Sequence, residues 1–208
     1  MSAEIHSAET GRDSAETRET VAESTMKFDW LVAIKGNLDA IFADDPNVFV
    51  AGANLICANA YDWKETIAPS VYVAFGRPKK KRGQYKVWTE RGIFPQVVFE
   101  VRWLGTNEPE MMAKCDFYGR YGAEELYVID PDYKKFEVWL RDGDRLDYRS
   151  HKGEFVSPRL RIRFDGSNND LVLYRPDGQR FSTYLELNDR TNRLAAKLRS
   201  LGFDPAEV

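Results

Sequence analysis

The stretch of sequence that decides the fold is residues 94–102, which read FPQVVFEVR. Apolar residues recur along this run at the alternation of a strand, so it predicts a β-strand. Glu100 shares one face of that strand with Val98 and Arg102. Because an unpaired buried carboxylate is costly, Glu100 needs a partner. An ion pair with Arg102 or Lys114 is one explanation, and a bound divalent cation is the other.

On both sides of this strand, the residue pattern predicts further strands and three helices. Short apolar runs bounded by turn residues predict strands at 48–51, 55–57, 71–75, 126–129, 136–140, 145–148, 160–164 and 171–174. Apolar residues at helical spacing predict a helix over 28–42. A second helix follows the capping residue Asn107 and ends at Gly122, and a third runs to Leu201. The fold class is therefore α+β, with largely antiparallel strands and a crossing helix.

Length and composition indicate one domain with appendages. The 208 residues are 43% hydrophobic, and 33 acidic against 30 basic side chains give a net charge of −3. This balance excludes a wholly disordered chain and a strong overall positive field. We expect residues 1–25 to form a disordered or loosely helical tail, residues 26–180 the domain, and residues 181–208 a C-terminal helix.

Cysteine and histidine are scarce. The two cysteines, Cys57 and Cys115, lie far apart in sequence, and one of the two histidines, His6, lies in the tail. A disulfide framework and a zinc site are therefore not expected. We find no apolar run long enough to span a bilayer and no signal peptide, so we expect a cytoplasmic protein without a membrane partner.

Several blocks of this sequence, taken in order, resemble one protein family. They are residues 68–79, 94–101, 117–118, 120–122, 124–125 and 130–132, together with Lys114. The set is similar to that of the Uma-type bacterial restriction endonuclease family, a branch of the PD-(D/E)xK nuclease superfamily. The resemblance implies a restriction-endonuclease-like mixed β-sheet core flanked by helices, with extra β-hairpins. It also implies a DNA endonuclease that hydrolyses phosphodiester bonds with Mg²⁺ or Mn²⁺.

The resemblance also assigns roles in the site. Glu100 matches the family's glutamate, a metal ligand, and Lys114 matches a helix-borne lysine that positions the nucleophile or stabilises the transition state. Arg102 stands where the superfamily has lysine, and it can clamp a phosphate but is a poor base. Ser70 follows Pro69, where the family has aspartate, and a neutral hydroxyl is a weak magnesium ligand.

The missing aspartate leaves more than one functional hypothesis open. Another carboxylate can supply the second metal ligand, with Asp62 and Glu65 as candidates, in which case the protein cleaves DNA. Alternatively, cleavage is weakened or lost, and a degenerate nuclease fold binds nucleic acid or a protein partner without cutting. In both cases we expect low metal occupancy. A third hypothesis makes the fold a scaffold for a homodimer formed through the last helix, where leucines recur at heptad spacing.

Positive charge is concentrated in a single run at residues 77–82. Its basic residues are Arg77, Lys79, Lys80, Lys81 and Arg82. A solvated surface loop is the simpler interpretation. As a binding element, the loop would contact DNA phosphates, because each cation placed on a phosphate releases counterions.

Overall fold

The fold is built on one six-stranded mixed sheet. The computed structural model describes the backbone of residues 13–102 and 107–207, and the side chains of residues 25–102 and 107–206. The strands lie in the order β1, β4, β6, β7, β8, β9. Their bounds are Val48–Gly52 (β1), Val71–Phe75 (β4), Val97–Val101 (β6), Glu125–Asp130 (β7), Lys135–Asp142 (β8) and Arg145–Tyr148 (β9). Neighbours pair antiparallel except β6 and β7, which are parallel and joined by the predicted crossing helix.

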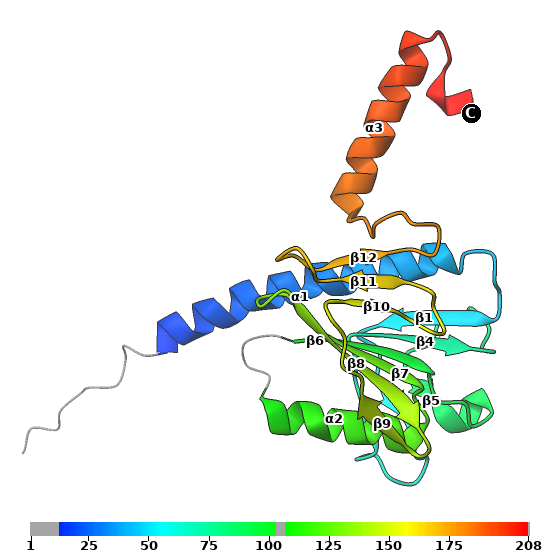
Figure 1. The fold of residues 1–208 in the computed structure, drawn as a ribbon. Coiled ribbons are helices and arrows are strands. Elements are labelled where there is room, and N and C mark those ends of the chain that lie inside the picture. The colour runs from blue at the N-terminus through cyan, green and yellow to red at the C-terminus, as the bar shows by residue number, and fades with distance from the viewer. Residues whose placement is uncertain (1–12, 103–106, 208) are drawn as a thin grey trace, which may run out of the picture.

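Helices cover both faces of this sheet (Figure 1). α1 (Asp13–Ile41) packs against the face that presents Val97 and Phe99. α2 (Glu108–Tyr121) packs against the opposite face, which presents Val98. Because side chains alternate along β6, Glu100 belongs to the face that α2 covers.

α1 is longer than the sequence pattern predicts. It begins at Asp13 rather than near Phe28, so the expected boundary between tail and domain at residue 25 falls inside one continuous helix. Residues 13–25 contain few apolar side chains, and hydrophobic periodicity therefore misses them. Their Ala, Glu and Arg residues favour a helix, whereas their Ser, Thr, Asp and Val residues favour it less, so propensity alone does not predict this start either. In Figure 1 this part of α1 extends past the sheet.

α2 begins and ends where its capping residues predict. The Asn107 side chain accepts a hydrogen bond from the Glu110 N–H at 2.9 Å, and Pro109 lies in the first turn. Gly122 ends the helix with a φ of 112°, a conformation that glycine adopts at little cost. These caps fix the segment of helix that faces Glu100.

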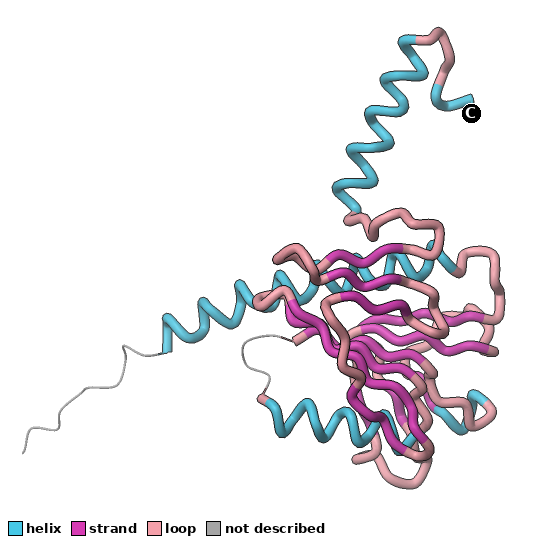
Figure 2. Tube along the Cα trace, viewed as in Figure 1, coloured by secondary structure: helices cyan, strands magenta, loops and turns pink. Residues whose placement is uncertain are grey.

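Beyond the six-stranded sheet, the described residues form two three-stranded sheets and two short 3-10 helices, which Figure 2 shows with the rest of the chain. One sheet contains β10 (Glu154–Val156), β11 (Arg163–Asp165) and β12 (Val172–Tyr174), and the other contains β3 (Thr66–Ile67), β2 (Ile56–Cys57) and β5 (Tyr85–Lys86). The 3-10 helices are Val87–Glu90 and Pro205–Glu207. The strand predicted at 160–164 is wrong in its first half, because Arg161 adopts a φ of 60° and pairing begins only at Arg163.

The last helix, α3 (Tyr184–Ser200), extends away from the sheets (Figure 1). A capping box at Thr183 and Glu186 starts it, and none of its residues is buried. Among the described residues, no helix has both the length and the apolar character needed to cross a membrane.

Candidate active site

The candidate site is centred on Glu100, near the C-terminal end of β6. Its side chain is 1% exposed, although the strand carries otherwise apolar residues. Glu100 pairs across the sheet with Val128 of β7. A buried carboxylate needs donors to replace water, and three side chains supply them.

Ser70 lies directly opposite Glu100, at the start of the neighbouring strand. The antiparallel register pairs Val71 of β4 with Phe99 of β6, so the residue before Val71 faces the residue after Phe99. The Ser70 hydroxyl donates to Glu100 Oε2 at 3.4 Å and accepts from the Val101 N–H at 3.0 Å. A neutral hydroxyl therefore occupies the place from which a second carboxylate would face Glu100.

α2 supplies the other two donors from one side of the helix. Lys114 Nζ lies 3.4 Å from Glu100 Oε1, and the Tyr118 hydroxyl donates to the same oxygen at 2.5 Å. Lys114 and Tyr118 are four residues apart, so one helical turn brings them to the same side. Burial, and then the charge of Glu100, raise the pKa of Tyr118 well above its ordinary value, so the hydroxyl remains a donor. The four-residue spacing from Lys114 is the signal in the sequence that Tyr118 also faces Glu100.

Arg102 is turned away from Glu100. Its guanidinium binds Glu108 at 2.6 and 3.2 Å and Glu137 at 3.1 Å, which fastens the first turn of α2 to β8. The hydrogen bond that Arg102 donates to Glu108 raises the pKa of Arg102. The ion pair of Glu100 is thus formed with Lys114 and not with Arg102.

The two candidates for a second metal ligand face other groups. Glu65 lies 3.8 Å from a guanidinium nitrogen of Arg120, and Asp62 accepts a hydrogen bond from the Lys64 N–H at 2.9 Å. Within the described part of the chain, no group of three or more His, Cys, Asp or Glu side chains is placed to hold a metal ion. Both oxygens of Glu100 already accept hydrogen bonds. This donor set does not fit Mg²⁺ or Mn²⁺, which require several oxygen ligands in an open octahedral array.

A second lysine, which the sequence analysis missed, faces the cluster from α1. Lys27 is half-buried, and its charge interacts with those of Glu100, Lys114 and Glu110. Burial is the largest effect and lowers the pKa of Lys27, against the opposing influence of Glu100. Local pattern could not reveal this lysine, because α1 and β6 lie far apart in the sequence.

Arg77 and Arg82, two of the five basic residues predicted to bind DNA, instead form ion pairs with a buried carboxylate. Arg82 Nε donates to Glu90 Oε1 at 2.7 Å, and Arg77 Nε lies 3.1 Å from Glu90 Oε2. Glu90 is only 2% exposed, and the hydrogen bond from Arg82 lowers its pKa. The Arg82 guanidinium also lies 3.9 Å above the Phe49 ring. These two arginines therefore hold the loop in place.

The three lysines of the same loop are exposed. Lys79 donates to the Ala43 carbonyl oxygen at 2.8 Å, just beyond the end of α1. Lys80 lies 3.6 Å from Glu90, with its side chain 56% exposed, and Lys81 is exposed as well. The charge that this loop presents to solvent comes mainly from Lys80 and Lys81.

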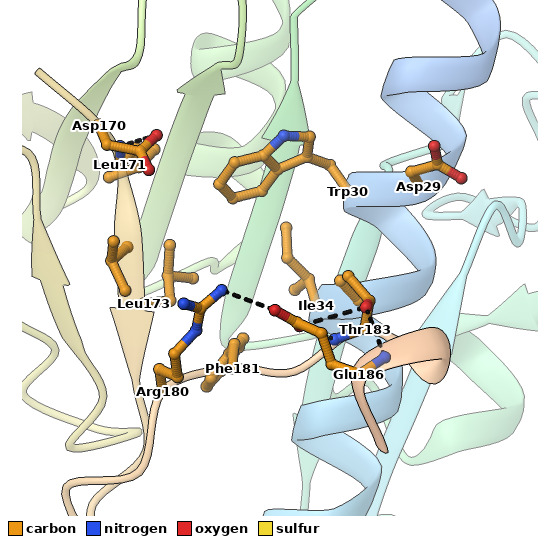
Figure 3. Close-up of a pocket in the computed structure, with 12 residues that line it drawn as sticks. Asp29, Trp30, Ile34, Asp170, Leu171, Leu173, Arg180, Phe181, Thr183 and Glu186 are labelled. Carbon is orange, nitrogen blue, oxygen red and sulfur yellow. Dashed lines mark hydrogen bonds and ion pairs between the residues drawn. The ribbon is translucent and has the colours of Figure 1, made fainter. Parts of the chain in front are cut away.

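A separate cavity of about 280 Å³ lies between α1 and β12 (Figure 3). Trp30, Ile34 and Phe181 give it an apolar lining. Arg180 and Glu186 pair with each other at 2.9 Å beside it. Ser70, Glu100, Arg102 and Lys114 do not line this cavity, so we place the candidate active site at Glu100 and not here.

No protein-family model matches the chain, and no curated protein matches its sequence. Among solved structures, the fold is similar to a protein of Anabaena variabilis ATCC 29413 described as a "putative nuclease belonging to DUF820". The two chains share 9% sequence identity with a TM-score of 0.46, and the match covers 62% of this chain and 70% of the other.

Proposed function

We propose that the protein binds DNA through a restriction-endonuclease-like core whose metal-dependent cleavage is weakened or lost. The observation that carries this proposal is the ion pair between the buried Glu100 and the half-buried Lys114, with Ser70 opposite Glu100. In the nuclease family that the sequence resembles, the position of Ser70 carries an aspartate. The arrangement keeps a phosphate-binding cation and lacks the second anionic metal ligand. The resemblance favours a bacterial source, and the scarcity of cysteine favours the reducing cytoplasm as its compartment.

The chemistry of the site supports binding better than hydrolysis. Two carboxylates in such nucleases hold a divalent ion that activates water and neutralises charge on the phosphate. Here the Ser70 hydroxyl donates to Glu100 and brings no negative charge. The Lys114 side chain is 22% exposed, so its ammonium group is fixed by Glu100 and still accessible from solvent. A lysine held in this way is a point charge suited to a phosphate oxygen.

Lys80 and Lys81 offer a second contact with the DNA backbone. Both are exposed on a loop that Arg77 and Arg82 hold through Glu90. A rigid loop loses less conformational freedom when it binds than a mobile one. Such contacts are independent of base sequence and depend strongly on salt.

Binding and cleavage are measured separately to test this proposal. We expect the wild-type protein to raise the anisotropy of a labelled DNA duplex and to leave supercoiled plasmid uncut in Mg²⁺. Lys114→Ala should weaken binding, whereas Lys197→Ala on the projecting helix α3 should not. Strong Mg²⁺-dependent nicking that disappears in Glu100→Ala would overturn the loss of cleavage. A protein that binds no DNA in any buffer would overturn the proposal as a whole.

A further inference from the structure

Lys27 occupies a position on α1 where an apolar residue would be expected. It is half-buried, while its neighbours Met26 and Phe28 are 46% and 62% exposed. A helix normally turns apolar side chains toward the domain and lysines toward solvent. α1 does the reverse at this turn. Partial burial of an ammonium group costs free energy, so a nearby partner must compensate it.

The packing of α1 identifies the place that Lys27 faces. Four residues later, Leu31 packs at the end of the sheet: a Cβ on Gly52 would lie 3.0 Å from Leu31 Cδ2 and 3.3 Å from the Ser70 carbonyl oxygen. Residues four apart lie on the same side of a helix. Lys27 therefore follows Leu31 along the same side of α1, beyond the strand end that carries Ser70.

The charges that act on Lys27 come from the sheet itself and from α2 on its other face. They are Glu100 of β6 and, on α2, Lys114 and the exposed Glu110. Lys114 pairs with Glu100 from α2, and Lys27 of α1 lies near enough for its charge to interact with both. Glu110 lies in the first turn of α2, where solvent screens its charge.

Ser70 changes the balance of charge at this site. An aspartate in its place would give three carboxylates against two lysines, a net charge of −1. With Ser70 neutral, Glu100 and Glu110 are balanced by Lys27 and Lys114, so the site attracts a divalent cation less and an anion more. We propose that Lys27 and Lys114 together hold a phosphate of the DNA backbone beside Glu100, without a metal ion. This inference rests on the proposed DNA binding and adds the second cation and the independence from metal.

The test measures binding of a labelled DNA duplex in EDTA at several salt concentrations. We expect wild-type affinity to be the same in EDTA and in Mg²⁺. Lys27→Gln should weaken binding on the order of tenfold at low salt. It should also reduce the slope of log K against log salt concentration by about one, the value for one lost phosphate contact. Lys27→Arg, which keeps the charge, should retain both the affinity and the slope.

Lys197→Gln is the control, because Lys197 lies on the projecting helix α3, where no residue is buried. If Lys27→Gln binds DNA as Lys197→Gln does, while Lys114→Ala is impaired, Lys27 is not part of the site and the proposed function stands. Binding that requires Mg²⁺ would also overturn the inference. If the wild-type protein binds no DNA, the proposed function fails, and this inference fails with it.

Discussion

At the scale of single residues, Glu100 is a buried carboxylate whose two oxygens already accept hydrogen bonds. Ser70, Lys114 and Tyr118 each place a donor on its carboxylate. An incoming cation would have to displace the hydroxyl of Tyr118, which lies in the interior. The interactions that make Glu100 tolerable inside the protein are the same ones that occupy its lone pairs.

Tyr118→Phe removes one of these donors and leaves the shape of the side chain unchanged. A hydrogen bond to a charged group contributes about 1.5–3 kcal/mol, so we expect the free energy of unfolding to fall by about that amount. Urea denaturation measures the change. Tyr61→Phe is the control, because Tyr61 is 99% exposed and its hydroxyl is solvated. Equal stability of the two variants would show that the Tyr118 hydroxyl does not support Glu100.

The sequence predicts some of these residue roles and not others. The alternation around Glu100 places it on a strand among apolar residues, and Ser70 is identified by its place after Pro69. The ion-pair partner of Glu100 could not be chosen between Arg102 and Lys114, because that choice depends on where α2 packs. Lys27 was missed for the same reason, since α1 meets the site only through the tertiary fold.

At the scale of elements, the loop at 77–82 is organised by one buried carboxylate, Glu90. The side chains of Arg82 and Glu90 are 4% and 3% exposed. In sequence the loop is a run of positive charge, and nothing local indicates that Arg77 and Arg82 turn inward. Their partner lies at the end of the 3-10 helix that follows β5. The charged surface of an element therefore depends on contacts that its own sequence does not contain.

Glu90→Gln tests this organisation through the pH dependence of stability. Loss of the charge leaves two buried guanidinium groups without their partner. We therefore expect the free energy of unfolding to fall by about 3–5 kcal/mol at neutral pH. The pKa of Glu90 is lowered in the folded protein. Its stabilisation is therefore complete above the ordinary glutamate pKa and is lost as the pH falls through the lowered value.

The difference in free energy of unfolding between the wild type and Glu90→Gln should accordingly become smaller in acid. Chemical denaturation at pH values from about 7 down to about 3 measures it. Glu154→Gln, at an exposed ion pair with Arg163, should change stability by no more than about 0.5 kcal/mol. If the difference in free energy of unfolding between the wild type and Glu90→Gln stays constant as the pH falls, the charge of Glu90 does not stabilise the protein.

α1 and α2 illustrate what local sequence can predict about an element. The bounds of α2 follow from Asn107 and Gly122, because capping is a local interaction. The start of α1 does not follow from hydrophobic periodicity, because residues 13–25 carry few apolar side chains. The sequence predicts the helix that joins β6 to β7, and the structure adds that these two strands pair in parallel, which requires such a crossover.

At the scale of the whole molecule, the site lies where two layers of helix meet the end of one strand. α1 and α2 cover opposite faces of the sheet (Figure 1), and each contributes a lysine near Glu100. α3 stands apart from this arrangement. Asn37 anchors the segment before it, because its side chain donates to the Ser182 carbonyl oxygen at 2.9 Å and accepts from the Ser182 N–H at 3.2 Å.

Removal of residues 183–208 should leave the domain folded. None of the residues of α3 is buried, so we expect the thermal midpoint to change by less than about 2 °C. Differential scanning calorimetry measures the midpoint. A drop well beyond this would show that α3 stabilises the domain.

The homodimer predicted from Leu187, Leu194 and Leu201 stays a prediction, and sedimentation of the full and shortened chains at equal concentration tests it.

The most direct test of the central claim is the shift in thermal midpoint that Mg²⁺ causes in Ser70→Asp. Two facing carboxylates should destabilise this variant in EDTA and create a magnesium site. Mg²⁺ at a hundredfold excess over its Kd should raise the midpoint by roughly 5–10 °C. Ser70→Asn and the wild type should not respond, and Glu100→Ala in the Ser70→Asp background should abolish the shift. An equal Mg²⁺ response in the wild type, or no response in Ser70→Asp, would contradict the claim that Ser70 has removed the metal from this site.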